Sequence, residues 1–312
     1  MRRLIPILIL TLSLAGCNLP TESTPALPTS TAEPAPTSTP VLTPTFDPAK
    51  LGTSQLDVTY CTVAGVELKM DVYYPATMNG PAPAAVYVHG GAWRSGDKRS
   101  GVGSGEGAIL TSAGFVVFAV NYRLAPEYRF PAMIEDVKCA IRSIRAHASD
   151  YGIDPDRIGA FGASAGGHLV SMLGTTDASA GFDVGQYLEH SSRVQAVVDM
   201  CGPSDLTLQF SDEQTQRASE VFTIDQLVKA SPVSYITPDD PPFLILQGDR
   251  DRVVPPEQSQ VLYDRLTAGG VSAQLVMVEN AGHGFDPVGG ETNPPRAELS
   301  LMVLGFLVEH LK

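Results

Sequence analysis

Short apolar runs and longer amphipathic stretches alternate along the chain from about residue 53. Residues 65–75, GVELKMDVYYP, place apolar and polar side chains at alternate positions, which is typical of a half-buried antiparallel strand. Residues 84–90 and 115–122 are apolar runs that suit strands buried on both faces. The same signals predict further strands at 157–162, 194–200, 242–248 and 271–279.

Helical periodicity fills several of the intervals between these runs. In residues 130–149 the apolar side chains Ile134, Val137, Ile141 and Ile144 recur at helical spacing. Residues 168–173, 256–270 and 296–310 also read as helical. An initial hairpin-like pair followed by alternating strands and helices predicts an α/β fold, with a mostly parallel eight-stranded sheet and helices on both faces. Residues 177–190 and 205–235 leave room for a small cap at most.

The N-terminus departs from this pattern. Arg2 and Arg3 precede an apolar run, residues 4–14, that is too short to span a bilayer comfortably. The run ends in Leu-Ala-Gly-Cys at residues 14–17, which resembles the lipobox of bacterial lipoproteins. We therefore expect residues 1–16 to be a lipoprotein signal peptide and Cys17 to carry the lipid anchor. The alternative is an ordinary signal peptide with an incidental cysteine.

Pro, Thr and Ser dominate the next segment, residues 17–50, which shows no apolar periodicity. Such a composition cannot bury enough surface to order itself, and its prolines favour an extended spacer. We expect residues 17–50 to be a lipid-anchored disordered linker and residues 51–312 to form one domain. The domain would face outward from a bacterial membrane, at the cell surface or in the periplasm.

Composition and charge exclude several other classes of protein. The 312 residues are 43% hydrophobic, enough for one large core, and the net charge of −13 argues against nucleic acid or anionic lipid headgroups as partners. No Cys/His spacing suggests zinc, and no phosphate-binding glycine loop is present. Besides Cys17 the chain has Cys61, Cys139 and Cys201, which allow at most one bridge within the chain. We interpret Cys139 and Cys201 as buried small hydrophobic residues and leave the pairing open.

A candidate nucleophile stands in Gly-Ala-Ser-Ala-Gly, residues 162–166. This matches the G-x-S-x-G pattern of a nucleophile elbow, in which a sharp turn between a strand and a helix presents a serine hydroxyl. Ser164 follows the strand predicted at 157–162 and precedes a helical stretch, as the elbow requires. Its small neighbours permit the strained turn.

A serine nucleophile needs a base, and the base needs an acid to orient it. Among six histidines, His283 lies on a glycine-flanked loop directly after the last predicted strand, where it can reach over the sheet. Asp251 follows the strand predicted at 242–248 and is our first candidate for the acid. Asp249 in the same turn and Asp205 after the preceding strand are alternatives. The order Ser, Asp, His is the one expected for this architecture.

The stretch HGGAW, residues 89–93, ends a predicted strand about 70 residues before the elbow. Glycine turns of this type present backbone N–H groups to the oxyanion of a tetrahedral intermediate. We expect the N–H groups of Gly91, Ala92 and, from the elbow, Ala165 to serve as donors.

Together these residues resemble the α/β-hydrolase superfamily, and more closely its hormone-sensitive-lipase-like esterases. HGGAWRSGDK, NYRLAPEYRFPA and PPFLILQGDRDRVVPPEQS are most similar to the branch of bifunctional feruloyl and acetyl-xylan esterases. The resemblance runs from about residue 55 to 311 and implies an α/β-hydrolase fold for the domain at 51–312, with Ser164, Asp251 and His283 as its catalytic triad. It implies no metal and no organic cofactor. One position departs from the family pattern: Gln247 replaces the usual histidine before the acid.

The resemblance further implies a serine esterase that acts through an acyl-enzyme, on acetyl or feruloyl esters of plant polysaccharides. A general short-chain carboxylesterase, an arylformamidase, a small peptidase and a non-catalytic carbohydrate-binding lipoprotein are the alternatives. Trp93 and Tyr122 lie near the predicted oxyanion strand ends, where they either wall the substrate pocket or pack in the core. Arg123 is expected to form a structural ion pair.

Overall fold

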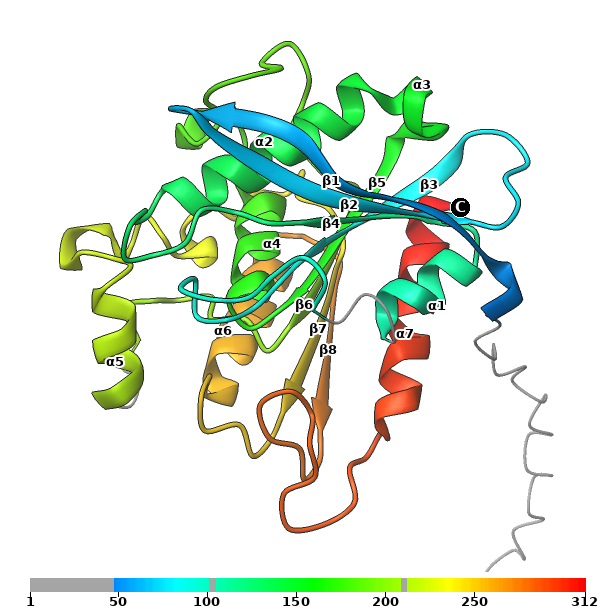
Figure 1. Cartoon of the computed structure of the whole chain (residues 1–312). Helices are drawn as coiled ribbons and strands as arrows, with labels where there is room; N and C mark the ends of the chain where they lie inside the picture. The colour runs from blue at the N-terminus through cyan, green and yellow to red at the C-terminus, as the bar shows by residue number, and fades with distance from the viewer. Residues whose placement is uncertain (1–47, 101–104, 209–211) are drawn as a thin grey trace, which may run out of the picture. The chain divides into compact units, whose positions relative to one another are not determined.

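A computed structural model describes residues 48–100, 105–208 and 212–312. The described strands form one eight-stranded sheet in the order β1-β2-β4-β3-β5-β6-β7-β8 (Figure 1). Strand β2 pairs antiparallel with β1 and with β4, and all other neighbours are parallel. The strands are β1 (Leu51–Val63), β2 (Val66–Pro75), β3 (Ala82–Val88), β4 (Val116–Val120), β5 (Ile153–Ala163), β6 (Ala196–Met200), β7 (Phe243–Gly248) and β8 (Ala273–Val278).

Helices cover both faces of this sheet. The α-helices are α1 (Glu106–Ser112), α2 (Ala132–Ala146), α3 (Ala148–Tyr151), α4 (Ala165–Thr175), α5 (Asp212–Ser219), α6 (Pro256–Ala268) and α7 (Arg296–Leu311). Helices α1 and α7 share one face, whereas α2, α4 and α6 pack on the other (Figure 1). Short 3-10 helices are η1 (Pro48–Lys50), η2 (Ala178–Ala180), η3 (Ile224–Gln226) and η4 (Pro232–Ser234). No helix in the described ranges is long and apolar enough to cross a membrane.

Strand β3 shows why the central strands are apolar throughout. Val86 and Val88 belong to the core beneath α2 and α4, and Ala85 and Tyr87 point to the core beneath α7. Because side chains alternate across a strand, a sheet covered on both faces needs an apolar residue at every position. Burial of each large aliphatic side chain contributes about 1.5–3 kcal/mol.

The predicted architecture is confirmed in its strands, its parallel order and its covering helices. The amphipathic stretch at 130–149 divides into α2 and α3, which meet at His147. Helix α1 was not predicted, because its seven residues are too few to show a periodic pattern. The proposed signal peptide, Cys17 and the linker up to residue 47 lie outside the described residues.

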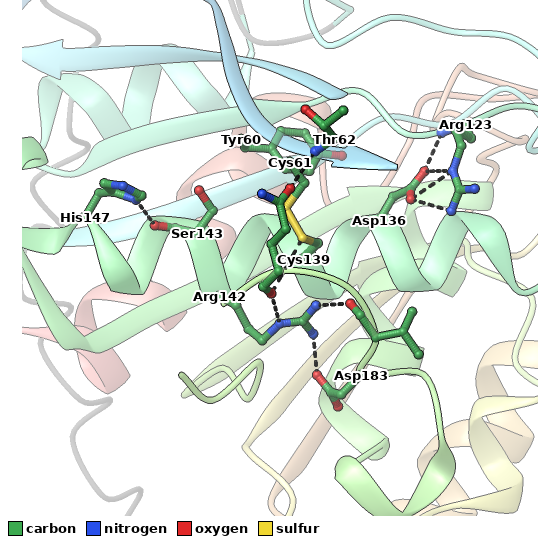
Figure 2. Close-up of a disulfide and its surroundings, with 12 residues drawn as sticks. Tyr60, Cys61, Thr62, Arg123, Asp136, Cys139, Arg142, Ser143, His147 and Asp183 are labelled. Atoms are coloured by element: carbon green, nitrogen blue, oxygen red, sulfur yellow. Dashed lines mark hydrogen bonds and ion pairs between the residues drawn. A yellow bond between two sulfur atoms is a disulfide. The ribbon is translucent and has the colours of Figure 1, made fainter. Parts of the chain in front are cut away.

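A disulfide joins Cys61 on β1 to Cys139 on α2 (Figure 2). Both cysteines are buried, and the bridge ties the edge strand of the sheet to the helix that covers it. The predicted burial of Cys139 is confirmed, and the pairing that the sequence left open is Cys61 with Cys139. The helical pattern correctly placed Cys139 on the buried face, but the neighbour on that face comes from 78 residues away.

Charged side chains of α2 hold the loop that follows α4. Arg142 donates to the backbone carbonyls of Val184 and Gln186, at 2.5 and 3.0 Å, and pairs with the Asp183 carboxylate at 2.6 Å (Figure 2). Arg145 donates in the same way to the carbonyls of residues 191 and 193. A buried guanidinium is stable only when its donors are satisfied, and here most acceptors are backbone oxygens.

Arg123 forms the structural ion pair that we expected. Its guanidinium contacts the Asp136 carboxylate at 2.7 Å, and its backbone N–H donates to the same carboxylate (Figure 2). The pair fixes the segment after β4 against α2.

Candidate active site

Ser164 occupies the turn between β5 and α4 in a conformation that L-residues rarely adopt, with φ 56° and ψ −121°. Its N–H donates to the Met200 carbonyl, and its own carbonyl accepts the N–H of His168. These bonds hold the turn from both sides. Strained backbone of this kind costs about 1–3 kcal/mol, and the surrounding structure has to impose it.

The turn after β3 lies directly against this elbow. A Cβ atom on Gly90 would lie 2.8 Å from the Ala163 carbonyl, and one on Gly166 would lie 2.0 Å from the Val88 carbonyl. Only glycine allows these two backbone segments to approach so closely. The predicted oxyanion turn and the predicted nucleophile are thus neighbours in space.

The structure brings Ser164, His283 and Asp251 into one hydrogen-bonded chain. His283 Nε2 lies 3.0 Å from Ser164 Oγ, and His283 Nδ1 lies 2.7 Å from Asp251 Oδ2. The three residues follow β5, β8 and β7, respectively. Since these parallel strands lie within four consecutive positions of the sheet, their carboxyl ends bring distant parts of the sequence together.

Asp251 is buried and held in place by several donors. The backbone N–H groups of Val253 and Val254 donate to its Oδ1 at 2.8 and 3.0 Å. Gln247 Nε2 donates to its Oδ2 at 3.2 Å, and Ser259 Oγ donates in turn to Gln247 Oε1. The residue that departs from the family pattern therefore supports the acid rather than displacing it.

The two alternative acids do not contact His283. Asp249 Oδ1 accepts the N–H of Ala281 at 3.3 Å, so this carboxylate fixes the loop that carries His283. Asp205 Oδ1 accepts both the N–H and the hydroxyl of Thr207 and so closes a local turn. Of the three candidate carboxylates, Asp251 alone reaches the imidazole.

The environment of His283 stabilises its charged form. Burial lowers the pKa of His283, but the hydrogen bond to Asp251 and the contact with the Cys201 sulfur outweigh burial and raise the pKa above its ordinary value of 6.5. The imidazolium would form if the imidazole took a proton from Ser164. A partner that favours this cation favours the transfer.

The predicted oxyanion donors lie in a strained turn beside the elbow. Gly91 and Ala92 have φ values of 110° and 54°. Ala165 is the first residue of α4, where an N–H has no partner within the helix. Among the described residues, no backbone carbonyl accepts the N–H of Gly91, Ala92 or Ala165. These donors remain available to a ligand.

Trp93 and Tyr122 both make packing contacts. The Trp93 indole N–H donates to His168 Nδ1 at 3.1 Å, and its ring packs edge-on against Phe222. Tyr122 stacks on the His89 ring and donates to the His89 carbonyl at 2.9 Å. Both aromatic side chains are buried, so their described role is to support the turn at 89–93.

Sequence reasoning missed the place of Cys201. It is buried, as predicted, but its Sγ lies within 4.8 Å of ligand atoms of both Asp251 and His283. Asp199 fixes this turn, because its carboxylate accepts the Gly202 N–H and the Ser171 hydroxyl, each at 2.8 Å. Complete burial raises the pKa of Asp199 to about 6. One signal in the sequence could have placed it: Cys201 comes directly after β6, and β6 pairs with β5, the strand that leads into Ser164.

Comparison with known proteins gives a consistent picture. The family model BD-FAE matches residues 70–266. A probable carboxylic ester hydrolase of Mycobacterium tuberculosis, LipM, is 34% identical over 245 residues, which are 74% of this chain and 55% of LipM. The chain spans about half the length of the curated relatives it matches.

Two solved structures share this fold along nearly their whole length. A truncated carbohydrate esterase from gut microbiota has a TM-score of 0.73 and 29% identity, covering 85% of this chain and 98% of that one. Esterase Est2 of Thermogutta terrifontis, solved with butyrate bound, has a TM-score of 0.67 and 27% identity, covering 82% and 94%. The same esterase has also been solved phosphorylated by paraoxon.

Proposed function

This chain belongs to the BD-FAE family of α/β-hydrolase esterases, and on that premise we propose that it hydrolyses carboxylic esters with Ser164 as nucleophile, His283 as base and Asp251 as acid. The observation that carries the proposal is the continuous hydrogen-bonded chain from Asp251 through His283 to a serine held in a strained elbow. Paraoxon forms phosphoryl adducts with serine nucleophiles, so the phosphorylated Est2 structure supports the choice of a serine.

The first half of the reaction transfers the acyl group to the protein. Ser164 Oγ attacks the ester carbonyl while His283 Nε2 takes the hydroxyl proton. Asp251 accepts the hydrogen bond from Nδ1, which fixes the tautomer that leaves Nε2 free to act as base. The N–H groups of Gly91, Ala92 and Ala165 stabilise the oxyanion. Each such donor is worth roughly 3–4 kcal/mol in related active sites.

The second half regenerates the serine. His283 gives its proton to the departing alcohol, and the acyl group remains on Ser164 Oγ as an ester. Water then enters, loses a proton to His283 Nε2 and attacks the acyl carbonyl. Collapse of the second tetrahedral intermediate releases the carboxylic acid, and His283 returns the proton to Ser164.

For the substrate, we propose acetyl or feruloyl esters of plant polysaccharides. The likeness to a carbohydrate esterase from gut microbiota supports this choice. A general short-chain carboxylesterase is the second candidate, because the Est2 structure contains butyrate. Fold and triad are common to both, so the substrate has to be identified by assay.

The test compares the wild-type chain with Ser164→Ala on four esters: p-nitrophenyl acetate, p-nitrophenyl octanoate, acetylated xylan and methyl ferulate. Wild-type turnover that falls about a millionfold in the variant is the expected result. A preference for acetylated xylan or methyl ferulate supports the carbohydrate-ester proposal, and a preference for p-nitrophenyl esters supports the second candidate. Undiminished turnover in the variant contradicts the choice of Ser164.

A labelling experiment separates these proposals from a binding protein and from an arylformamidase. A fluorophosphonate probe should label the wild-type chain and leave Ser164→Ala unlabelled. A carbohydrate-binding lipoprotein has no activated serine and would remain unlabelled in both forms. Labelling without turnover of any ester would direct the search to N-formylkynurenine and other amides.

We further propose that the protein is exported and anchored through lipid on Cys17. The buried Cys61–Cys139 bridge supports export, because disulfides persist in oxidising compartments. Expression of the full chain in a bacterium, with a Cys17→Ala control, tests the proposal. Membrane fractions should contain the wild-type protein and lack the variant. Equal distribution of the two forms would contradict the anchor.

A further inference from the structure

Three potential metal ligands of different chemistry converge at one point beside the serine. The sulfur of Cys201, a carboxylate oxygen of Asp251 and a ring nitrogen of His283 all lie within 4.8 Å of one another. In the described part of the chain, no other group of three such side chains comes this close. The residues follow β6, β7 and β8, which are consecutive in the sheet.

The spacing of the three residues in the sequence conceals this arrangement. They are 50 and 32 positions apart, whereas zinc motifs that can be recognised in a sequence place ligands a few residues apart. Here the three ligands are brought together because they follow neighbouring strands of the sheet, not because they are close in the sequence.

The donor set suits a borderline-soft divalent cation. Thiolate, imidazole and carboxylate are the three ligand types that zinc binds in proteins, and a hard ion such as magnesium would not select the sulfur. With bonds of about 2.0 Å to nitrogen or oxygen and about 2.3 Å to sulfur, ligand atoms around a tetrahedral ion lie roughly 3.5 Å apart. Here His283 Nδ1 and Asp251 Oδ2 are 2.7 Å apart and no pair of ligand atoms is more than 4.8 Å apart, so the separations lie within about 1.3 Å of that value.

The positions of the ligands also set a limit on access. Cys201 and the Asp251 side chain are buried, but the His283 side chain is 25% exposed. An ion therefore enters on the side of the imidazole and displaces the hydrogen bond between Nδ1 and Asp251. Cys201 is a free cysteine, so its sulfur is available, and the thiol releases its proton to water as the sulfur–metal bond forms.

We propose that Cys201, Asp251 and His283 form an inhibitory site for Zn²⁺ and similar divalent cations. Its occupation takes away both the base and the acid on which the proposed function relies, so the ion and catalysis exclude each other. Metal binding itself does not depend on the proposed function. The fourth ligand is water, since three protein ligands leave one position of a tetrahedral ion open.

Cobalt provides a test that needs no turnover. In a full-length Cys17→Ala background with the Cys61–Cys139 bridge intact, Cys201 is the one free thiol of the chain. Titration with Co²⁺ should produce the near-ultraviolet charge-transfer absorption of a cobalt–thiolate bond. The band should be absent when Cys201→Ser or Cys201→Ala is added. Absence of the band in the Cys17→Ala protein itself would overturn the proposal without reference to any variant at the site.

Inhibition gives the second measurement. Zn²⁺ should suppress ester hydrolysis by the wild type reversibly, with recovery on addition of a chelator. The inhibition constant should weaken in Cys201→Ser by at least the roughly 10- to 100-fold that loss of even an outer-shell partner costs. His190→Gln is the matched control, because it removes a half-buried histidine that lies 3.7 Å from the Glu189 carboxylate and outside the proposed site, and it should leave the constant unchanged.

Two results would refute the inhibitory role. Equal sensitivity of wild type and Cys201→Ser to Zn²⁺ would show that the sulfur is not a ligand. Loss of inhibition by Zn²⁺ in His190→Gln would show that the ion binds at His190 and not at Cys201, Asp251 and His283. If the chain hydrolyses no ester at all, the proposed function fails while the cobalt spectrum still decides whether the metal site exists.

Discussion

Removal of the Cys61–Cys139 bridge should lower stability strongly and leave catalysis intact. The perturbation is the double variant Cys61→Ala/Cys139→Ala. The bridge lies between β1 and α2, and neither cysteine belongs to the chain of Ser164, His283 and Asp251. Any loss of activity at moderate temperature should therefore reflect unfolded protein alone.

The expected magnitude follows from the length of the closed loop. The bridge joins residues 78 positions apart. A cross-link over that distance lowers the entropy of the unfolded chain and so raises the free energy of unfolding by about 4.5 kcal/mol near 25 °C. A natural domain is stable by about 5–15 kcal/mol, so the variant should still fold, with roughly 0.5–10 kcal/mol of stability left. For a domain of this size the loss corresponds to a melting temperature roughly 10–15 °C lower.

Urea unfolding of wild type and double variant, each with and without reductant, provides the measurement. Reductant should lower the free energy of unfolding of the wild type toward that of the variant and leave the variant unchanged. Cys201 is free in both proteins, so it cancels from the comparison. A difference below about 1 kcal/mol between oxidised wild type and variant would refute the loop-entropy reasoning.

Three further predictions concern the site itself. Ser164→Gly should be more stable than Ser164→Ala by about 1 kcal/mol in urea unfolding. Glycine relieves backbone strain of about 1–3 kcal/mol at φ 56°, and its greater entropy in the unfolded chain costs about 0.5–1 kcal/mol. A less stable glycine variant would show that the turn is not strained. Burial raises the pKa of Asp199 to about 6, so the folded state favours the protonated carboxyl. The stability that this protonated carboxyl contributes is lost as pH rises from about 4 through 6. Asp199→Asn should consequently gain up to about 3 kcal/mol relative to wild type between about pH 4 and pH 8, and a constant difference across that range would contradict the shift. Because the pKa of His283 is raised and its neutral form is needed as a base, kcat/KM should increase with pH with a midpoint above 6.5, and Asp251→Asn should move the midpoint downward; a wild-type midpoint at or below 6.5 would be the contrary result.

Local sequence patterns were enough to predict the fold and to choose the residues that meet at the strand ends. The apolar runs and helical periods determine which segments are strands and helices, and parallel order then fixes where the strands end. Ser164 and His283 could be chosen because each stands on a glycine-flanked turn directly after a strand. Their catalytic roles remain predictions until the variants are assayed.

The choice among acids required the structure. Asp249 and Asp251 lie in the same turn, and both are suited to accept backbone hydrogen bonds. Which carboxylate turns toward His283 depends on the donors around it, including the side chain of Gln247. A substitution that looked like a departure from the family pattern supplies one of those donors.

The roles of the cysteines could not be read from local pattern at all. Cys139 and Cys201 were both correctly predicted to be buried. One forms a disulfide with β1 and the other lies beside the imidazole, and these outcomes depend on partners 78 and 82 positions away. Hydrophobic periodicity indicates which face of an element a residue occupies, but it does not indicate which residue from elsewhere in the chain packs against it.

The guanidinium groups of α2 have a consequence for how this sequence can drift over evolutionary time. Arg142 and Arg145 hold the loop after α4 chiefly through backbone carbonyls, at residues such as Val184, Gln186 and Ser191. Every amino acid carries that carbonyl, so the loop side chains at these positions can be exchanged without loss of the contact. Selection would then act on the two arginines, and the loop they hold would be free to diversify at constant shape.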